Sequence, residues 1–257
     1  MTYWGGVEMQ RKKALTAGMT LVGAVATLMF TASPMAAETA TELDLALCAP
    51  RENTFSLDID NIYYPLPVGQ QWVYQGREQG LTIGLRITVL DQTENFYSGS
   101  RTVSTRVVEE LEWEDANANG LVDDGAESLI EISRNFYAQT QDGTLCYFGE
   151  DVDIYEGGVV VSNEGAWRAD DRGHAPGIFM PADPRPGMSF QQEVAPGIAE
   201  DQATVVRRGK TVTVPAGTFA DTITVRDFNP LDGSRGTKIY APHVGLIVDG
   251  PLDLIDY

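Results

Sequence analysis

Basic side chains are scarce in this chain. Of its 257 residues, 18 are Lys or Arg and 37 are Asp or Glu, so the formal net charge is −19. Beyond residue 13 the lysines are Lys210 and Lys238. A surface this acidic repels the phosphates of nucleic acids and of anionic lipids. The composition therefore predicts a protein with no nucleic-acid partner.

Long apolar runs are also missing, apart from one near the start. Residues 14–32 are apolar, follow the basic residues 11–13, and precede a small-residue stretch that ends at Ala37. This order is typical of a secretory signal peptide cleaved near residue 37. The alternative is an uncleaved membrane anchor, because the run is near the shortest length that spans a bilayer. We favour cleavage, which leaves no stable membrane span and predicts a periplasmic or extracellular protein.

Cysteine is limited to Cys48 and Cys146. An even pair in an exported protein predicts one disulfide, which would tie an N-terminal arm to the middle of the chain. The alternative is two separate buried thiols. Neither cysteine has a second one nearby in a Cys-x-x-Cys motif, so a redox site or a zinc site is not expected.

Beyond the first apolar run the sequence shows no helical periodicity. Its apolar residues instead alternate with polar residues at a period of two. Gly, Pro, Asn and Asp separate the alternating segments. The expected strands are Gln71–Glu78, Leu81–Asp91, Thr102–Trp113, Ser128–Thr140, Leu145–Phe148, Ile154–Ser162, Met188–Val194, Ala203–Arg207, Thr211–Val214, Thr218–Phe228, Gly236–Tyr240 and Gly245–Val248. The pattern predicts an all-β fold, either an antiparallel β-sandwich or an open curved half-barrel. It divides the chain into a signal peptide (1–37), an N-terminal arm (38–60) and one β domain (61–257).

Recognisable catalytic motifs are absent as well. No Gly-x-Ser-x-Gly segment marks a nucleophile, and His174 and His243 lie far apart in loop-like contexts. Paired acids such as Glu150 and Asp151, Asp170 and Asp171, or Glu200 and Asp201 are read as solvated surface in so acidic a chain. The aromatic residues at strand positions predict core packing, with a cavity for an apolar ligand as the alternative. We therefore expect no catalytic residues.

One segment, residues 115–127, has a specific chemical interpretation. It places short oxygen-bearing side chains at alternating positions, then Gly120, then further carboxylates. That layout resembles a calcium loop, and hard oxygen ligands favour calcium over softer metals. The expected ligands are Asp115, Asn117, Asn119, the Leu121 carbonyl, Asp123 and Glu127.

The match to an EF-hand is imperfect, because Glu127 is one position late and strands flank the loop. A metal-clamped hairpin tip is the favoured interpretation. A plain polar hairpin loop is the alternative, since Asn, Asp and Gly are common turn residues.

Three segments together carry a family resemblance. They are Tyr63–Tyr74 with the sequence YYPLPVGQQWVY, Val212–Phe219 with VTVPAGTF, and Tyr240–Ile247 with YAPHVGLI. Their order resembles exported bacterial β-rich proteins and lipoproteins of unknown function with a PLxxGxxWxY, VPAGTF and YAPGVGL pattern. The resemblance implies a curved antiparallel sheet and no catalytic residues. His243 stands where the pattern has Gly, and the 115–127 loop looks like an insertion.

These observations predict an exported, non-enzymatic binding or structural protein of the bacterial envelope or exterior, with a structural calcium loop. Its curved sheet would hold an apolar small ligand or an envelope protein partner. Two alternatives remain: a secreted hydrolase that uses His174 with Asp170 or Asp171, and a calcium-dependent adhesion module.

Overall fold

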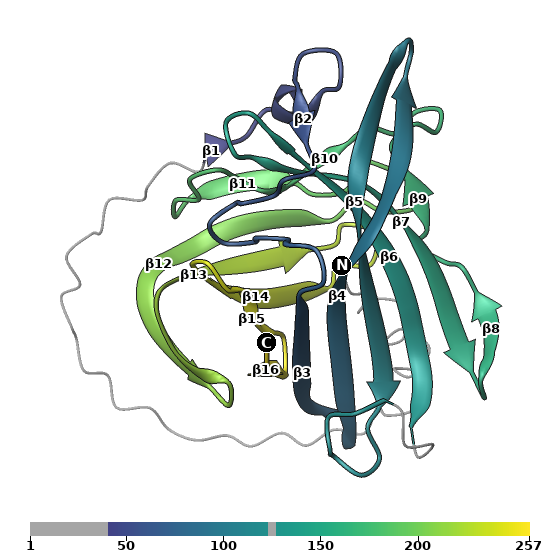
Figure 1. Cartoon of the computed structure of the whole chain (residues 1–257), viewed down its shortest axis with the longest axis vertical. Helices are drawn as coiled ribbons and strands as arrows, with labels where there is room; N and C mark the ends of the chain where they lie inside the picture. The colour runs from purple at the N-terminus through teal and green to yellow at the C-terminus, as the bar shows by residue number, and fades with distance from the viewer. Residues whose placement is uncertain (1–40, 123–126) are drawn as a thin grey trace, which may run out of the picture.

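The structure is a computed structural model that describes residues 41–122 and 127–257 (Figure 1). The predicted signal peptide lies outside this range. Within it, nearly every element is a strand, and almost all pairings are antiparallel. The predicted all-β, mainly antiparallel fold is confirmed. No helix in the described residues is long and apolar enough to cross a membrane.

The strands form a single sheet. Their bounds are β1 Thr41–Glu42, β2 Phe55–Ser56, β3 Gln71–Glu78, β4 Leu81–Ser98, β5 Arg101–Glu114, β6 Ser128–Thr140, β7 Leu145–Glu156, β8 Val159–Ser162, β9 Trp167–Arg168, β10 Gly177–Met180, β11 Met188–Gln191, β12 Gln202–Val214, β13 Gly217–Phe228, β14 Arg235–Ala241, β15 Gly245–Asp249 and β16 Leu252–Asp256; a 3-10 helix, η2, spans Leu45–Cys48. The main path runs β1-β11-β12-β13-β14-β15-β16-β3-β4-β5-β6-β7-β10.

The sheet curves into an open half-barrel. Figure 1 shows β12 and β13 curling round one side and β3 to β7 forming the other. Strand β16 lies between β15 and β3, and thereby joins the two halves of the chain into one sheet. Two walls of the same sheet consequently face each other across the interior.

Several strand boundaries differ from the sequence prediction. Strand β4 continues to Ser98 because its polar second half pairs with β5 after a register shift between Val89 and Thr93. That half carries mostly exposed side chains, so no alternation of burial marks it in the sequence. The segments 203–207 and 211–214 belong to one strand, β12, and β10 and β16 were not predicted.

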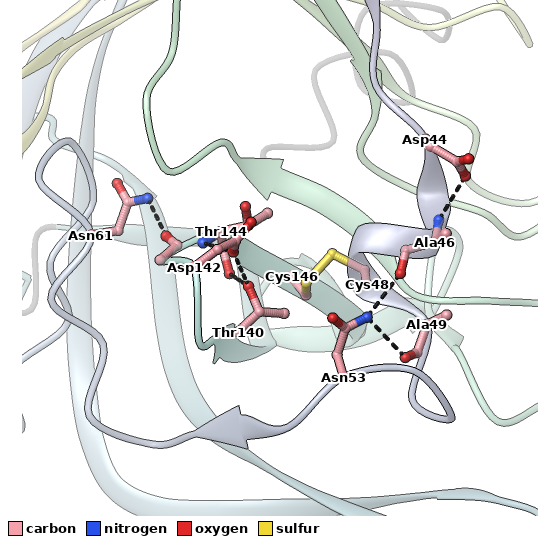
Figure 2. Close-up of a disulfide and its surroundings, with 11 residues drawn as sticks. Asp44, Ala46, Cys48, Ala49, Asn53, Asn61, Thr140, Asp142, Thr144 and Cys146 are labelled. Atoms are coloured by element: carbon pink, nitrogen blue, oxygen red, sulfur yellow. Dashed lines mark hydrogen bonds between the residues drawn. A yellow bond between two sulfur atoms is a disulfide. The ribbon is translucent and has the colours of Figure 1, made fainter.

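The described part of the N-terminal arm is held down by the predicted disulfide. Cys48, at the end of η2, bonds Cys146 in β7 with a Cα–Cα distance of 5.6 Å (Figure 2). Asn53 secures the same turn, because its Nδ2 donates to the carbonyl oxygens of Ala46 at 2.8 Å and Ala49 at 3.2 Å. The prediction of a disulfide is confirmed.

Aromatic side chains fill the space between the two walls. The ring of Tyr64 lies 6.0 Å from that of Tyr137 in β6 and 6.0 Å from that of Tyr240 in β14, and 4.7 Å from Phe179 in β10. Core packing, expected of the strand aromatics, is found for Trp72, Tyr74, Trp113, Phe136, Tyr137, Tyr147, Phe148 and Trp167. Tyr64 thus connects the two walls through ring contacts.

Candidate functional site

Asp115 anchors the predicted calcium loop to the sheet. Its side chain is fully buried, and its Oδ2 accepts hydrogen bonds from Gln75 Nε2 at 2.7 Å and from the Gly120 amide at 2.9 Å. Its own amide donates to the Thr82 carbonyl oxygen at 2.9 Å. Asp115 therefore fixes the start of the loop to β3 and β4.

In the residues that follow, backbone amides of the loop donate to side-chain oxygens of the same loop. The Asn119 amide donates to Asn117 Oδ1 at 3.0 Å, and the Leu121 amide donates to Asn119 Oδ1 at 2.8 Å. Gly120 has a left-handed φ of +73°, and a Cβ there would lie 2.7 Å from Ile255 Cδ1. The expected turn glycine is confirmed, and it lets the loop pack against β16.

The two ends of the candidate ligand set come together. Asn117 Nδ2 lies 3.5 Å from Glu127 Oε1, so positions 3 and 13 of the loop meet. Asp123 falls outside the described residues. Among the described residues, no three His, Cys, Asp or Glu side chains form a group that could hold a metal. The donors within reach are instead carboxylate, amide and carbonyl oxygens, the set that suits a hard cation such as calcium.

Two residues of the hydrolase alternative, His174 and Asp170, have other partners in the structure. His174 Nδ1 lies 3.0 Å from the Arg168 carbonyl oxygen, whereas Asp170 accepts from the Tyr97 amide at 3.0 Å and lies 3.9 Å from Arg168 Nε. His243 occupies an exposed turn with a φ of +64°.

A second group of residues, which the sequence reasoning missed, lines the interior. We call it the acidic layer: Glu110, Glu112, Glu131 and Glu150 on β5 to β7, and Asp227 and Asp249 on β13 and β15. All except Glu112 are buried, and Glu112 is half-buried. Reading Glu150 as solvated surface was wrong, because it is 1% exposed and burial raises its pKa to about 7.

Like charges meet directly within this layer. Glu112 on β5 and Glu131 on β6 are cross-strand partners, an arrangement that is unfavourable when both are ionised. Burial, together with the nearby charges of Glu78, Asp249 and Glu110, raises the pKa of Glu112 to about 8. Burial also raises the pKa of Glu131 well above its ordinary value, and Glu112 adds to that effect.

Lys238 lies beside two carboxylates on the opposite wall. Its Nζ lies 3.4 Å from Asp227 Oδ2 and 3.9 Å from Asp249 Oδ1, and all three side chains are buried. Burial acts to lower the pKa of Lys238, but the charges of Asp249 and Asp227, together with Tyr240 and Glu110, outweigh it and hold the pKa well above its ordinary value. The lysine therefore stays charged and is not poised to act as a nucleophile.

One signal in the sequence could have revealed the acidic layer. Glu110 and Glu112 keep the period-two phase of the buried Val108, which places them on its face of β5. Acidic residues at inward positions of a strand are unusual, because burying a charge is costly.

Comparisons of the chain with protein-family models, with curated proteins and with solved structures found no match. The resemblance to exported β-rich proteins therefore stays a prediction.

Proposed function

We propose that this is an exported, non-enzymatic binding or structural protein of the envelope or exterior, with a calcium ion held in its β5–β6 loop. The observation that carries the proposal is the folded loop itself, in which Asp115 is buried at one end and Asn117 meets Glu127 at the other. The Cys48–Cys146 disulfide supports export, because such bonds persist in oxidising compartments.

Calcium would act as a structural clamp in this loop. Asp115, Asn117, Asn119, the Leu121 carbonyl, Asp123 and Glu127 would supply the oxygens, and the ion would offset the repulsion between the carboxylates. Because Asp115 also bonds Gln75 of β3, a rigid loop would stiffen the neighbouring sheet. Calcium in this role changes stability and performs no chemistry.

Thermal unfolding in calcium and in chelator tests this proposal. A ligand present at 100 times its Kd stabilises the folded state by about 2.7 kcal/mol, so calcium raises the Tm of the wild-type protein. The double variant Asp115→Ala/Asn119→Ala loses that rise. Asp142→Asn is the matched control, since Asp142 also accepts from a turn amide, that of Thr144, but in a different hairpin.

The Asp142→Asn control keeps the full rise in Tm on addition of calcium, even if its Tm is below that of the wild-type protein in both calcium and chelator. A wild-type Tm that is identical in calcium and chelator would remove the calcium part of the proposal. Equal Tm losses of the double variant in both conditions would reduce the segment to a polar turn.

The interior offers little room for the apolar ligand expected from the sequence. A hollow beside Tyr64, Trp72, Tyr74 and Leu246 has no room for a water molecule. Pockets for small molecules usually measure roughly 300–1,000 Å³.

A further inference from the structure

The two ends of the curved sheet lie against each other without forming a ladder. In the part of the chain that the structure describes, β10 ends the main path on one side, and β11, covered by β1, ends it on the other. The two ends touch where the backbone of Gly177, the first residue of β10, meets that of Gln192, just after β11; a Cβ on Gly177 would overlap the Gln192 carbonyl oxygen. We call this contact the seam.

The seam is held by isolated hydrogen bonds. The Ala175 amide donates to the Val194 carbonyl oxygen at 3.0 Å, and Gln192 Nε2 donates to the Phe179 carbonyl oxygen at 3.3 Å. Gln192 is 1% exposed, and its Oε1 has no hydrogen-bond partner among the described residues. A buried acceptor without a partner is costly, so water that enters an opened seam offsets part of the cost of breaking these bonds.

Residues 41–48, which we call the strap, connect the two ends of the sheet (Figure 1). The strap begins with β1, which pairs in parallel with β11. The amides of Thr41 and Leu43 donate to the carbonyl oxygens of Gly187 and Ser189, at 2.9 Å in both cases. Strand β1 is two residues long and both of its side chains are exposed, so these amide bonds lie next to solvent, where local opening needs little free energy.

The other end of the strap is fixed covalently. Helix η2 packs against β10, and Cys48 at its end is bonded to Cys146 in β7 (Figure 2). Cys146 is the Cα partner of Ile178 in β10, so the disulfide holds the strap to the β10 side of the seam. Because this end is covalent and the other rests on two amide bonds to β11, the β1 end is the one that can detach and return.

We propose that the strap opens and closes the seam: its β1 end detaches from β11 and lets β10 and β11 separate, while the Cys48–Cys146 bond keeps the strap in place to close them again. Opening admits water, or a ligand of the interior, to Gln192 and to the ring of Phe179, both of which the closed seam buries. This inference goes beyond the proposed function and does not depend on the calcium loop, whose anchors are Gln75 in β3 and Thr82 in β4.

Native-state hydrogen exchange of the purified protein, read by mass spectrometry, tests the proposal. Peptides that contain residues 41–43, Ala175 and residues 192–194 exchange together, through an opening that needs less free energy than global unfolding. Peptides from the long β12–β13 ladder exchange only with global unfolding. The Ala49 amide, which donates to Ala46 beside the disulfide, stays protected longer than the amides of β1.

A proline substitution in β1 separates the strap from general loosening. Thr41→Pro removes one of the amide donors and speeds exchange of the Ala175 amide about two- to tenfold, which is what one hydrogen bond is worth. Glu42→Pro is the matched control. Amides of alternate residues face the same neighbouring strand, so the Glu42 amide is turned away from β11 and its loss leaves exchange at the seam unchanged.

Gly177→Ala disturbs the seam from the opposite side, since the new Cβ overlaps the Gln192 carbonyl oxygen. If the strap and the seam open together, this variant also speeds exchange of the Thr41 and Leu43 amides, because coupling between two sites is reciprocal. Circular dichroism and unchanged exchange in the β12–β13 ladder confirm that each compared variant is folded.

Three results would overturn the proposal. Exchange of residues 41–43 without the Ala175 amide would mean that β1 frays while the seam stays shut. Exchange of the seam only as fast as the β12–β13 ladder would make the strap a permanent clasp. Equal effects of Thr41→Pro and Glu42→Pro would show that the bonds from β1 to β11 do not control the seam.

Discussion

The indole of Trp113 lies directly on Gly84, its cross-strand partner in β4. A Cβ at residue 84 would collide with the indole ring, so only glycine fits beneath it. Trp113 is 1% exposed and precedes Asp115 by two residues. The glycine therefore sets how closely the base of the β5–β6 loop lies against the sheet.

Gly84→Ala should destabilise the protein by about 1–3 kcal/mol, because overpacking forces the indole to move. Tryptophan fluorescence and urea denaturation would measure this. Gly236→Ala is the control, since a Cβ there would meet Asp227 only at 3.6 Å, an ordinary contact. If Gly84→Ala loses no more stability than Gly236→Ala, the packing argument is contradicted.

Lys238→Met should cost about 3–5 kcal/mol, because it leaves Asp227 and Asp249 buried without their cation. Urea unfolding at pH 7 gives the value, and the loss should shrink at low pH as Asp227, whose pKa is raised by burial, takes up a proton. Lys210→Met serves as the comparison, since Lys210 is exposed on β12. Similar losses for the two variants would show that the buried ion pairs contribute little.

Removing the disulfide by Cys48→Ala/Cys146→Ala should destabilise the protein by about 2–5 kcal/mol, since the bond closes a long loop in the unfolded chain. The two cysteines are 98 residues apart, which places the expected loss towards the upper end. Denaturation of the wild-type protein with and without reductant checks the same quantity without mutation. A variant that matches the oxidised wild-type protein would contradict this expectation.

Stability should fall as pH rises from about 4.5 to 8. Burial raises the pKa of Glu112 from 4.5 to about 8, so in this range the folded state keeps a proton that the unfolded state has released. The groups that face Glu112 are Glu78 on β3, Glu110 on β5, Glu131 on β6 and Asp249 on β15, and all are acidic. Their charges act in the same direction.

Thermal denaturation between pH 5 and pH 8 measures this dependence. Glu112→Gln cannot ionise and should flatten the decline, whereas Glu109→Gln, on the other face of the strand, should leave it unchanged. A Tm that rises over this range, or equal slopes for both variants, would contradict the assignment.

The sequence predicted strands well where one face is buried. The bounds of Gln71–Glu78 and Ser128–Thr140 match β3 and β6, because alternation there reflects a true inside and outside. The Asp115 loop was also visible, since its spacing of oxygens and its glycine are local features. Strand β16 was not predicted, although Leu252 and Leu254 are buried and alternate with less buried residues, and its place in the sheet depends on β3 and β15.

The acidic layer shows a different limit of sequence reasoning. Glu112 and Glu131 carry the residue type of a solvated surface, and the pairing of β5 with β6 makes them cross-strand partners. Their proximity arises from strand pairing and from β13 to β15, far along the chain. Local composition cannot report such a meeting of distant segments.

The position of β16 between β15 and β3 has a consequence for the order in which the chain can fold. The first half of the sheet has no neighbour on the free edge of β3 until residues 252–256 arrive. Pairing between such distant segments is slow to form, because a long loop must close first. A nascent chain would thus keep this edge open until residues 252–256 are made, and an open edge can pair with other molecules.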